Sequence, residues 1–241
     1  MRYVLIKNDD QLDLQSLHQV CERWVMRRTA AVNQIRSLLL ERGVTLRKGR
    51  KYVDQQLPRI LEDAGLRLSG AVRTLLAQLK LELDQLAERI AEMDRVIYQT
   101  AGEYEGCRRM LAIPGIGPVT ATAIVAAIGN GQAFGKGRDF AAWIGLVLGE
   151  HSTGGKQRLL GISKRGNPNL RKLFVQGARA VLQKRSRQTS GLSCWLERLV
   201  ARKHGNVAVI ALANKLAQMA WAVLAKDQPY RPPVLASAPA I

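Results

Sequence analysis

Apolar side chains recur at helical spacing along two long stretches in the first half of the chain. From Asp9 to Leu40 they return every three or four residues, a period that predicts one long amphipathic helix. Acidic residues begin this stretch and arginines follow toward its end, which is the charge order that a helix dipole favours. Gly43 fits a left-handed cap after the helix. The apolar positions are Leu14, Leu17, Cys21, Trp24, Val25, Val32, Ile35 and Leu39.

The second stretch predicts another long helix, from Leu68 to Ile97. Its apolar positions step by alternating threes and fours over about four heptads, and charged residues flank them, which favours a coiled coil. One helix of a compact bundle is the alternative. We expect residues 9–106 to form a helical hairpin that links domains and pairs two copies of the chain. The apolar positions are Leu68, Val72, Leu75, Leu79, Leu83, Ile90, Met93 and Ile97.

In the second half, the segment LAIPGIGPVTATAIVAAIG (residues 111–129) predicts a tight turn between two helical segments. Gly115 and Gly117 allow backbone N–H groups to face outward at the start of the next helix, where they and the helix dipole suit a phosphate oxygen. Such a turn resembles the hairpin of helix-hairpin-helix DNA binders, which hold the DNA backbone without reading its sequence. A plain corner between two helices is the alternative.

The two ends of the chain carry different patterns. Residues 2–7 (RYVLIK) form a short β-type run, which is either the last strand of a sheet or a frayed terminus. Residues 204–226 predict an apolar core helix, and the Pro- and Ala-rich residues 227–241 predict a disordered tail. The expected fold class is all-α, with a residual N-terminal β-strand in residues 1–8 and a compact basic helical domain in residues 107–226.

Charge narrows the range of partners. The chain has 37 Lys and Arg against 19 Asp and Glu, a formal net charge of +18, and Glu197 is the only acid between His151 and Lys203. Such an excess attracts polyanions, and nucleic acid is the leading partner because Lys and Arg make most phosphate contacts. An anionic membrane surface is the competitor, although no uncharged apolar stretch reaches the ~18 residues that span a bilayer. The three cysteines are far apart and lack zinc-ligand spacing, so we expect a reduced, cytoplasmic protein that binds no membrane.

One segment combines hydroxyls, glycines and cations. In HSTGGKQRLLGISKRGNPNLRKLF (residues 151–174), Ser152 and Thr153 precede two glycines. A serine needs a base, a metal or a cationic site to act as a nucleophile, and this loop offers cations but no clear base. His151 is adjacent, but neighbouring residues in a loop seldom point the same way. A polar turn before a basic helix is the alternative. The candidate phosphate-binding side chains are Lys156, Arg158, Lys164, Arg165, Arg171 and Lys172.

Acidic residues are scarce around this loop. Asp139 and Glu150 are the nearest acids before it, and no acids cluster at metal-ligand spacing. Nucleases of the two-metal type need several converging carboxylates. We therefore expect that this chain alone builds no magnesium site.

Four motifs, in order, resemble the transposases of the insertion-sequence one-ten family and its one-one-one-one subgroup. They are LAIPGIGPVTATAIVAAIG, FAAWIGLV, HSTGGKQRLLGISKRGNPNLRKLFVQGARAV and NVAVIALANKLAQMAWAVL. The resemblance extends from RYVLIK to about Lys226, nearly the whole chain. It implies DNA transposition at the ends of an insertion element, directed by a structured bridge RNA, in the bacterial cytoplasm beside the nucleoid.

The family architecture implies a RuvC-like domain of ribonuclease-H fold before the coiled coil, with an Asp-Glu-Asp-Asp set that binds Mg²⁺. Residues 1–8 would be the end of that domain, so none of its metal ligands maps onto this chain. The resemblance places the family's catalytic serine, which forms a phosphoserine link to DNA, at Ser152, or at Thr153 if the glycines are aligned. Leu148 and Gly149 stand where relatives carry a proline and a basic residue, which removes one cation.

Two functions follow from the resemblance. Either the chain is a transposase that cuts and joins DNA ends, or it is a catalytically inactive fragment that binds DNA or RNA and dimerises. The missing carboxylates favour the second for the chain taken alone. A third reading is a helix-hairpin-helix repair or ribosome-associated factor, and the paired hydroxyls argue against it because a pure binder does not need them there.

Overall fold

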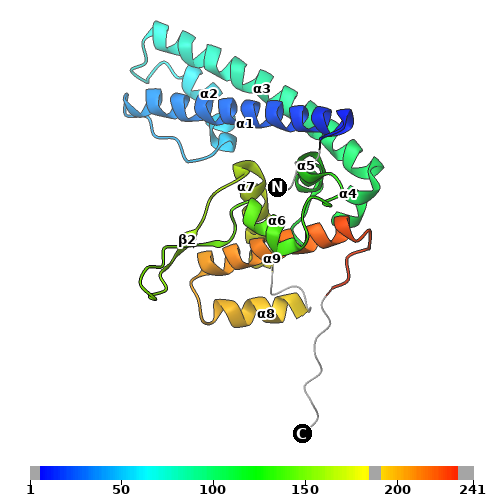
Figure 1. The fold of residues 1–241 in the computed structure, drawn as a ribbon. Helices are drawn as coiled ribbons and strands as arrows, with labels where there is room; N and C mark the ends of the chain where they lie inside the picture. Colours follow the sequence, from blue (N-terminus) through cyan, green and yellow to red (C-terminus); the bar gives the residue numbers. More distant parts are fainter. Residues whose placement is uncertain (1–5, 185–190, 233–241) are drawn as a thin grey trace. The chain divides into compact units, whose positions relative to one another are not determined.

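The computed structural model describes residues 6–184 and 191–232 (Figure 1). This described part is mainly α-helical, as predicted, and contains two short strands. Its helices are α1 (Asp9–Leu40), α2 (Arg50–Glu62), α3 (Gly70–Glu103), α4 (Glu105–Met110), α5 (Pro118–Ile128), α6 (Gly137–Trp143), α7 (Pro168–Lys184), α8 (Gly191–Val200) and α9 (Gly205–Ala225). Its strands are β1 (Leu148–Glu150) and β2 (Leu159–Ile162).

The chain divides into two compact units. The first, Ser16–Val96, is here called the three-helix unit; the second joins Met1–Gln15 to Ile97–Ile241 and is called the C-terminal unit. The boundaries fall inside α1 and α3, so each of these long helices contributes residues to both units.

The three-helix unit buries one apolar core that α1, α2 and α3 share. Much of the apolar seam predicted for a coiled coil packs inside this core of a single chain. Leu83 is fully buried and Leu68 nearly so, whereas Leu75 is half exposed. α2 was not predicted, because its sequence is basic and contains Pro58; it still turns Val53 and Leu57 inward at helical spacing. The buried cluster is Ala31, Val32, Ile35, Leu39, Leu46, Val53, Leu57, Leu68, Leu76 and Leu83.

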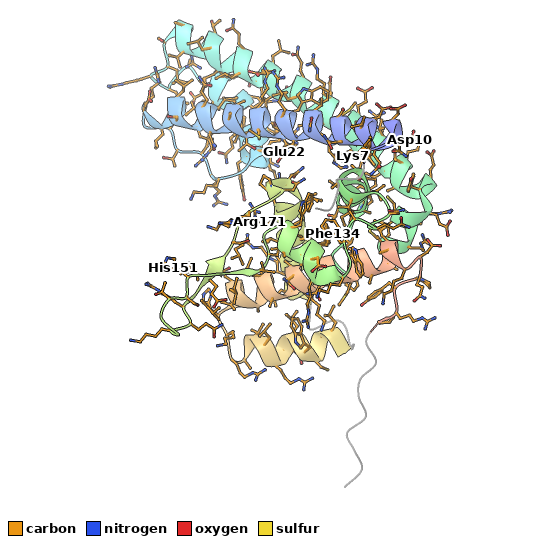
Figure 2. All side chains as sticks on the ribbon, in the orientation of Figure 1. Lys7, Asp10, Glu22, Phe134, His151 and Arg171 are labelled. Atoms are coloured by element: carbon orange, nitrogen blue, oxygen red, sulfur yellow. The ribbon has the colours of Figure 1, made fainter. Side chains whose placement is uncertain are left out.

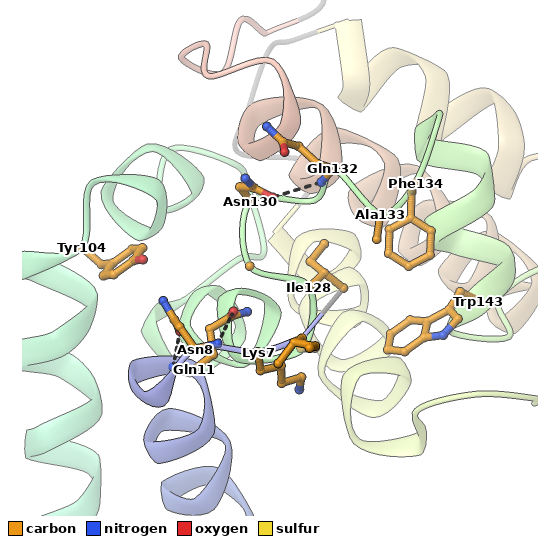
Figure 3. Close-up of a pocket in the computed structure, with 13 residues that line it drawn as sticks. Lys7, Asn8, Gln11, Tyr104, Ile128, Asn130, Gln132, Ala133, Phe134 and Trp143 are labelled. Carbon is orange, nitrogen blue, oxygen red and sulfur yellow. Dashed lines mark hydrogen bonds between the residues drawn. The ribbon is translucent and has the colours of Figure 1, made fainter. Parts of the chain in front are cut away.

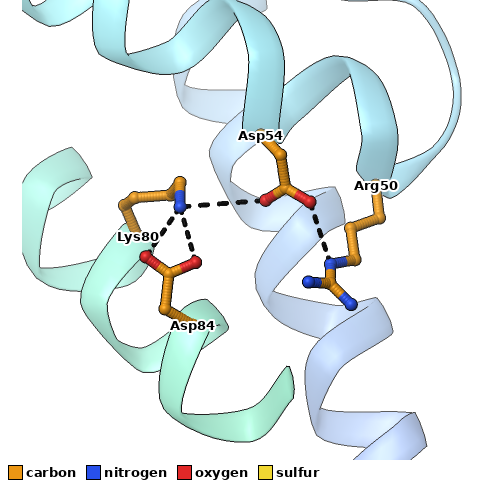
Figure 4. Close-up of polar contacts among 4 residues, drawn as sticks. All are labelled: Arg50, Asp54, Lys80 and Asp84. Carbon is orange, nitrogen blue, oxygen red and sulfur yellow. Dashed lines mark hydrogen bonds and ion pairs between the residues drawn. The ribbon is translucent and has the colours of Figure 1, made fainter. Parts of the chain in front are cut away.

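Polar contacts fix α2 against α3. The Lys80 ammonium lies 2.6 Å from a carboxylate oxygen of Asp84 and 3.8 Å from one of Asp54, which also pairs with Arg50 at 3.0 Å (Figure 4). These groups are partly exposed, so each pair contributes little, about 0.2–1 kcal/mol. Arg73 of α3 adds a stronger contact, because its guanidinium donates to carbonyls at and beyond the end of α2. The acceptors are the carbonyl oxygens of Ile60, Leu61, Asp63, Leu66 and Leu68, at 2.6–3.4 Å.

The C-terminal unit is organised around α9, which packs against α4, α6, α7 and α8 (Figure 1). The predicted apolar core helix of residues 204–226 is therefore confirmed. By length and composition α9 could also cross a membrane, which the search for uncharged runs missed because Lys215 interrupts the segment. Half of that apolar window is buried inside the protein, as expected of a core helix.

The terminal predictions lie largely outside the described residues. Residues 6–8 of the β-type run have no regular structure, and residues 1–5 are not described. Residues 233–241 of the predicted tail are likewise not described. Residues 228–232 are described and form no helix or strand.

Candidate nucleic-acid interface

The Ser-Thr-Gly-Gly segment forms the tip of a β-hairpin between α6 and α7. β1 pairs antiparallel with β2, and the backbone pairs again at Thr153 and Lys156. The two glycines between this last pair have φ angles of 58° and 75°. Two successive positive φ values are what a type I′ turn requires, and the twist of that turn matches the strands it joins. The expected loop is thus an ordered hairpin, with both hydroxyls just before its tip.

The base of the hairpin is fixed to the helices around it. The Nη1 atom of Arg171 donates to the carbonyl oxygens of Ile144 and Arg165, both at 2.9 Å. Asn214 of α9 donates from Nδ2 to the Leu146 carbonyl at 3.1 Å. Figure 2 shows Arg171 at α7 and His151 far out on the hairpin. The hairpin therefore projects into solvent from a base held by buried helices.

Ser152 has an acidic partner that the sequence interpretation missed. Its Oγ donates to a carboxylate oxygen of Glu150 at 2.5 Å and accepts the backbone N–H of Arg158 at 3.2 Å. The signal that could have found this pair is the spacing of two residues, which places both side chains on one side of an extended segment. A carboxylate against a serine hydroxyl is the arrangement of a nucleophile and its base.

The neighbouring residues are placed differently. Thr153 is exposed, and its carbonyl accepts the Lys156 N–H at 3.1 Å, a contact that closes the turn. In the described part of the chain no hydrogen bond of the Thr153 hydroxyl is found. His151 is exposed, and its backbone N–H pairs with the Arg158 carbonyl at 3.0 Å. Of the two candidate hydroxyls, the structure gives only that of Ser152 a carboxylate partner.

The predicted phosphate-binding cations gather at the hairpin and its base. Lys156 and Arg158 lie on the hairpin, and Lys164 and Arg165 lie two and three residues after the end of β2; all four are exposed. Within residues 6–184 and 191–232, their side-chain nitrogens make no hydrogen bond or ion pair. A hollow of about 490 Å³ beside the hairpin is lined by eight residues, Gly149, Glu150, His151, Leu160, Gly161, Ile162, Ser163 and Arg165. It is large enough for a phosphate group, and Glu150 and Arg165 both belong to its wall.

The other two candidate cations lie on α7. Arg171 is half-buried and is engaged with the two carbonyls that hold the hairpin base. Lys172 is exposed in the first turns of the helix. Arg171 therefore holds the base of the hairpin, a role that its sequence motif did not suggest. Its binding of a phosphate remains a prediction.

The Pro-Gly-Ile-Gly-Pro turn connects α4 to α5, as predicted. Gly115 has a φ of 84° and packs against α7: an added Cβ would lie 2.8 Å from the carbonyl oxygen of Gly177. Gly117 is exposed, precedes the first residue of α5, and has open space beside its Cα. The two glycines thus differ, because Gly115 permits close packing and Gly117 leaves the N-terminus of α5 accessible. Phosphate binding here stays a prediction.

The described residues contain no group of three or more His, Cys, Asp or Glu side chains placed to hold a metal ion. Glu150 is a single carboxylate beside Ser152, and Mg²⁺ prefers several oxygen ligands. These residues therefore do not fit a magnesium site.

The fold and the hairpin define a class: a mainly α-helical, strongly basic protein that exposes a hydroxyl and a carboxylate on a cation-rich β-hairpin. Comparison with known proteins gives the family. Residues 107–194 match the model described as "Transposase IS116/IS110/IS902 family". A Pseudomonas aeruginosa protein named "Probable family 20 transposase" is 43% identical over 233 residues, covering 96% of this chain and 69% of the relative. The chain belongs to this transposase family.

Two further relatives are named as transposases of insertion elements. The Coxiella burnetii protein named "Transposase for insertion sequence element IS1111A" is 40% identical over 231 residues, covering 96% of this chain and 64% of the relative. The Yersinia enterocolitica protein named "Transposase for insertion sequence element IS1328" is 38% identical over 223 residues, covering 92% of this chain and 66% of the relative. The chain spans about two thirds of the length of these relatives.

Proposed function

We propose that this chain supplies the nucleophile of an insertion-sequence transposase, and that Ser152 forms a covalent phosphoserine link to a DNA end. The observation that carries the proposal is the 2.5 Å hydrogen bond from Ser152 Oγ to Glu150 on an exposed hairpin. Family membership supports it, because relatives are named as transposases of insertion sequences. Such enzymes act on DNA, whose phosphates suit the exposed cations.

The reaction step follows from the contacts of Ser152. The Glu150 carboxylate takes the hydroxyl proton while Oγ attacks the phosphorus of a phosphodiester, and a P–Oγ bond replaces the P–O bond to one sugar. The displaced sugar oxygen leaves as a hydroxyl after taking a proton from solvent. A hydroxyl end of a second DNA strand then attacks the phosphorus of the phosphoserine and loses its proton to solvent. The P–Oγ bond breaks and Glu150 returns its proton to Oγ, which restores Ser152 and joins the strands. Lys156 and Arg158 stabilise the negative charge that builds on the phosphate oxygens.

The remaining parts of the proposal rest on the family resemblance. Mg²⁺ and its carboxylate ligands would come with a RuvC-like domain, since the residues described here do not fit that site. A structured guide RNA would be a second polyanionic partner of the basic surface. Two copies would act together through the long helices, because exchanging strands between two duplexes needs more than one nucleophile.

An activated substrate tests the nucleophile without a metal site. An oligonucleotide that ends in a 4-nitrophenyl phosphodiester carries a leaving group that needs little stabilisation. We expect release of nitrophenolate and a protein–DNA adduct that mass spectrometry maps to residue 152. The Ser152→Ala variant should form no adduct, and the matched Thr153→Val variant should form it at the wild-type rate.

Two results would contradict the proposal. An adduct on residue 153 would reassign the nucleophile. Salt-sensitive DNA binding without any adduct would identify the chain as a binding and dimerising fragment, which the lack of a metal-binding cluster among the described residues favours.

A further inference from the structure

A second cavity of the C-terminal unit lies away from the hairpin. Its volume is about 640 Å³, and aromatic rings and side-chain amides share its wall (Figure 3). It forms where the segment before α1 meets the connection from α5 to α6. Its wall includes Lys7, Asn8, Asn130, Gln132, Phe134 and Trp143.

Trp143 forms a flat platform in this wall. Its indole is stacked on the ring of Phe140, with centroids 6.2 Å apart and planes at 22°. Phe140 is fully buried, whereas Trp143 is 41% exposed. Trp143 lines the cavity and is only partly covered by its neighbours, so part of its indole surface stays accessible. The ring centroid of Phe134 lies 5.7 Å from that of Trp143, with the two planes at 60°. An aromatic face held in this way suits stacking with another flat ring.

Polar groups line the same cavity. Asn130 Oδ1 accepts the Gln132 N–H at 3.2 Å, and Asn8 Oδ1 accepts the Gln11 N–H at 2.9 Å, which orients both amides. Among the described residues, the Nδ2 groups of Asn8 and Asn130 have no hydrogen-bond acceptor. The Lys7 ammonium is held by the Ala126 carbonyl at 2.8 Å and by Gln15, and it adds positive charge to the wall. Oriented amides beside an aromatic face can bind the edge of a heteroaromatic ring.

We propose that this cavity binds one unstacked nucleobase of a DNA or RNA strand, with the base stacked on Trp143 and its edge bound by the amides. An apolar ligand would leave the amide groups unpaired, and a phosphate alone would leave the aromatic face unused. A nucleobase can stack on the aromatic face and also pair with the amide groups. The net charge of +18 attracts the strand that carries it. The proposal rests on the nucleic-acid binding inferred above and adds a site for a base that is out of its stack.

The test uses the whole chain and short single strands of DNA and RNA with the same sequence. Each carries 2-aminopurine, whose fluorescence is quenched by stacking, and a terminal fluorescein that reports binding through anisotropy. We expect binding to quench 2-aminopurine in at least one of the two strands, and the strand that responds identifies the source of the base. Trp143→Leu should abolish the quenching and weaken binding about tenfold. Trp143→Phe should retain the quenching and the affinity of the wild type. A fully paired duplex should show no effect that depends on Trp143.

The control variant removes an aromatic ring elsewhere in the same unit. Tyr98 is 58% exposed on α3 and does not line the cavity, so Tyr98→Ala should behave as wild type. If anisotropy rises but Trp143→Leu leaves the quenching unchanged, the base site is wrong and nucleic-acid binding stands. If anisotropy does not rise for any strand or duplex, both proposals are contradicted. Circular dichroism of each variant identifies any loss of fold.

Discussion

Two glycine-containing turns of the C-terminal unit carry the same sequence-based expectation, that of contacting phosphate, yet the structure uses them in opposite ways. Around Gly115 the turn is closed, because its backbone meets Gly177 of α7 with no space for a side chain. At the hairpin tip, by contrast, a Cβ on Gly154 or Gly155 would meet no atom within 4 Å. Gly115 permits close packing against α7, whereas Gly154 and Gly155 only set the hairpin turn.

The cations near these turns differ in the same way. Arg171 is engaged with two carbonyls inside the protein, whereas Lys156 and Arg158 extend from the hairpin without a partner among the described residues. A glycine or an arginine in a basic motif therefore does not by itself indicate a ligand. The groups that remain available to a partner are those whose hydrogen bonds and packing are not already used within the fold.

The largest effect is expected at Gly177. Its Cβ would lie 2.1 Å from the Gly115 carbonyl oxygen, a backbone atom that cannot move aside cheaply. Gly177→Ala should lower the free energy of unfolding of the C-terminal unit by about 3 kcal/mol or more. Gly154→Ala is the matched control and should lower it by only about 1–2 kcal/mol, the cost of a positive φ for alanine. Urea unfolding followed by circular dichroism measures both, and equal effects would refute the comparison.

Arg171 should matter next. Arg171→Ala removes a charged donor from two carbonyls at the hairpin base and should lower the free energy of unfolding by about 2 kcal/mol. Lys156→Ala removes an exposed cation and should change it by less than about 0.5 kcal/mol. A similar loss of stability in the two variants, measured in the same urea titrations, would mean that the hairpin cation is also structural.

The hairpin cations should instead affect DNA binding. The double variant Lys156→Ala/Arg158→Ala should reduce the slope of log K against log[salt] by about 2, since each phosphate contact contributes about 0.9. The control Lys51→Ala/Arg67→Ala removes two exposed cations from the three-helix unit and should leave the slope unchanged. Fluorescence anisotropy with duplex DNA at several salt concentrations gives both slopes. An unchanged slope in the hairpin variant would remove the hairpin from the interface.

The smallest effect concerns Cys107 of α4, close to the Gly115 turn. Burial raises the pKa of this thiol to about 12, so it stays protonated and unreactive at pH 8. Iodoacetamide should modify Cys21 and Cys194, which are half-buried, before Cys107. Mass spectrometry of the native and the unfolded chain measures the order, and equal labelling in the native chain would show that the α4 region opens.

The sequence predicted the elements whose pattern is long and regular. α1, α3 and α9 each contain many turns of apolar periodicity, and the Pro-Gly-Ile-Gly-Pro segment correctly indicated a turn before α5. α2 was missed because thirteen residues with an internal proline give a weak signal. The hairpin was missed because β1 and β2 have only three and four residues, too few for a clear alternation.

The candidate site was predicted in part. Ser152 and the cations around it are visible in one short motif, but the contact of Asn214 with the Leu146 carbonyl joins residues far apart in the sequence. The pairing of Gly115 with Gly177 is equally remote. Contacts of this kind depend on how helices pack, which the local pattern does not determine. Glu150 is the exception, because its spacing to Ser152 could have been recognised.

The rate of adduct formation with the 4-nitrophenyl oligonucleotide shows whether Glu150 takes the proton of Ser152. Glutamine at this position can still accept the serine hydrogen bond but cannot take the proton, so Glu150→Gln separates positioning from proton transfer. We predict that Glu150→Gln and Glu150→Ala both slow adduct formation by about 100-fold or more, while DNA affinity is retained. A Glu150→Gln variant that forms the adduct at the wild-type rate would show that Glu150 does not take the serine proton.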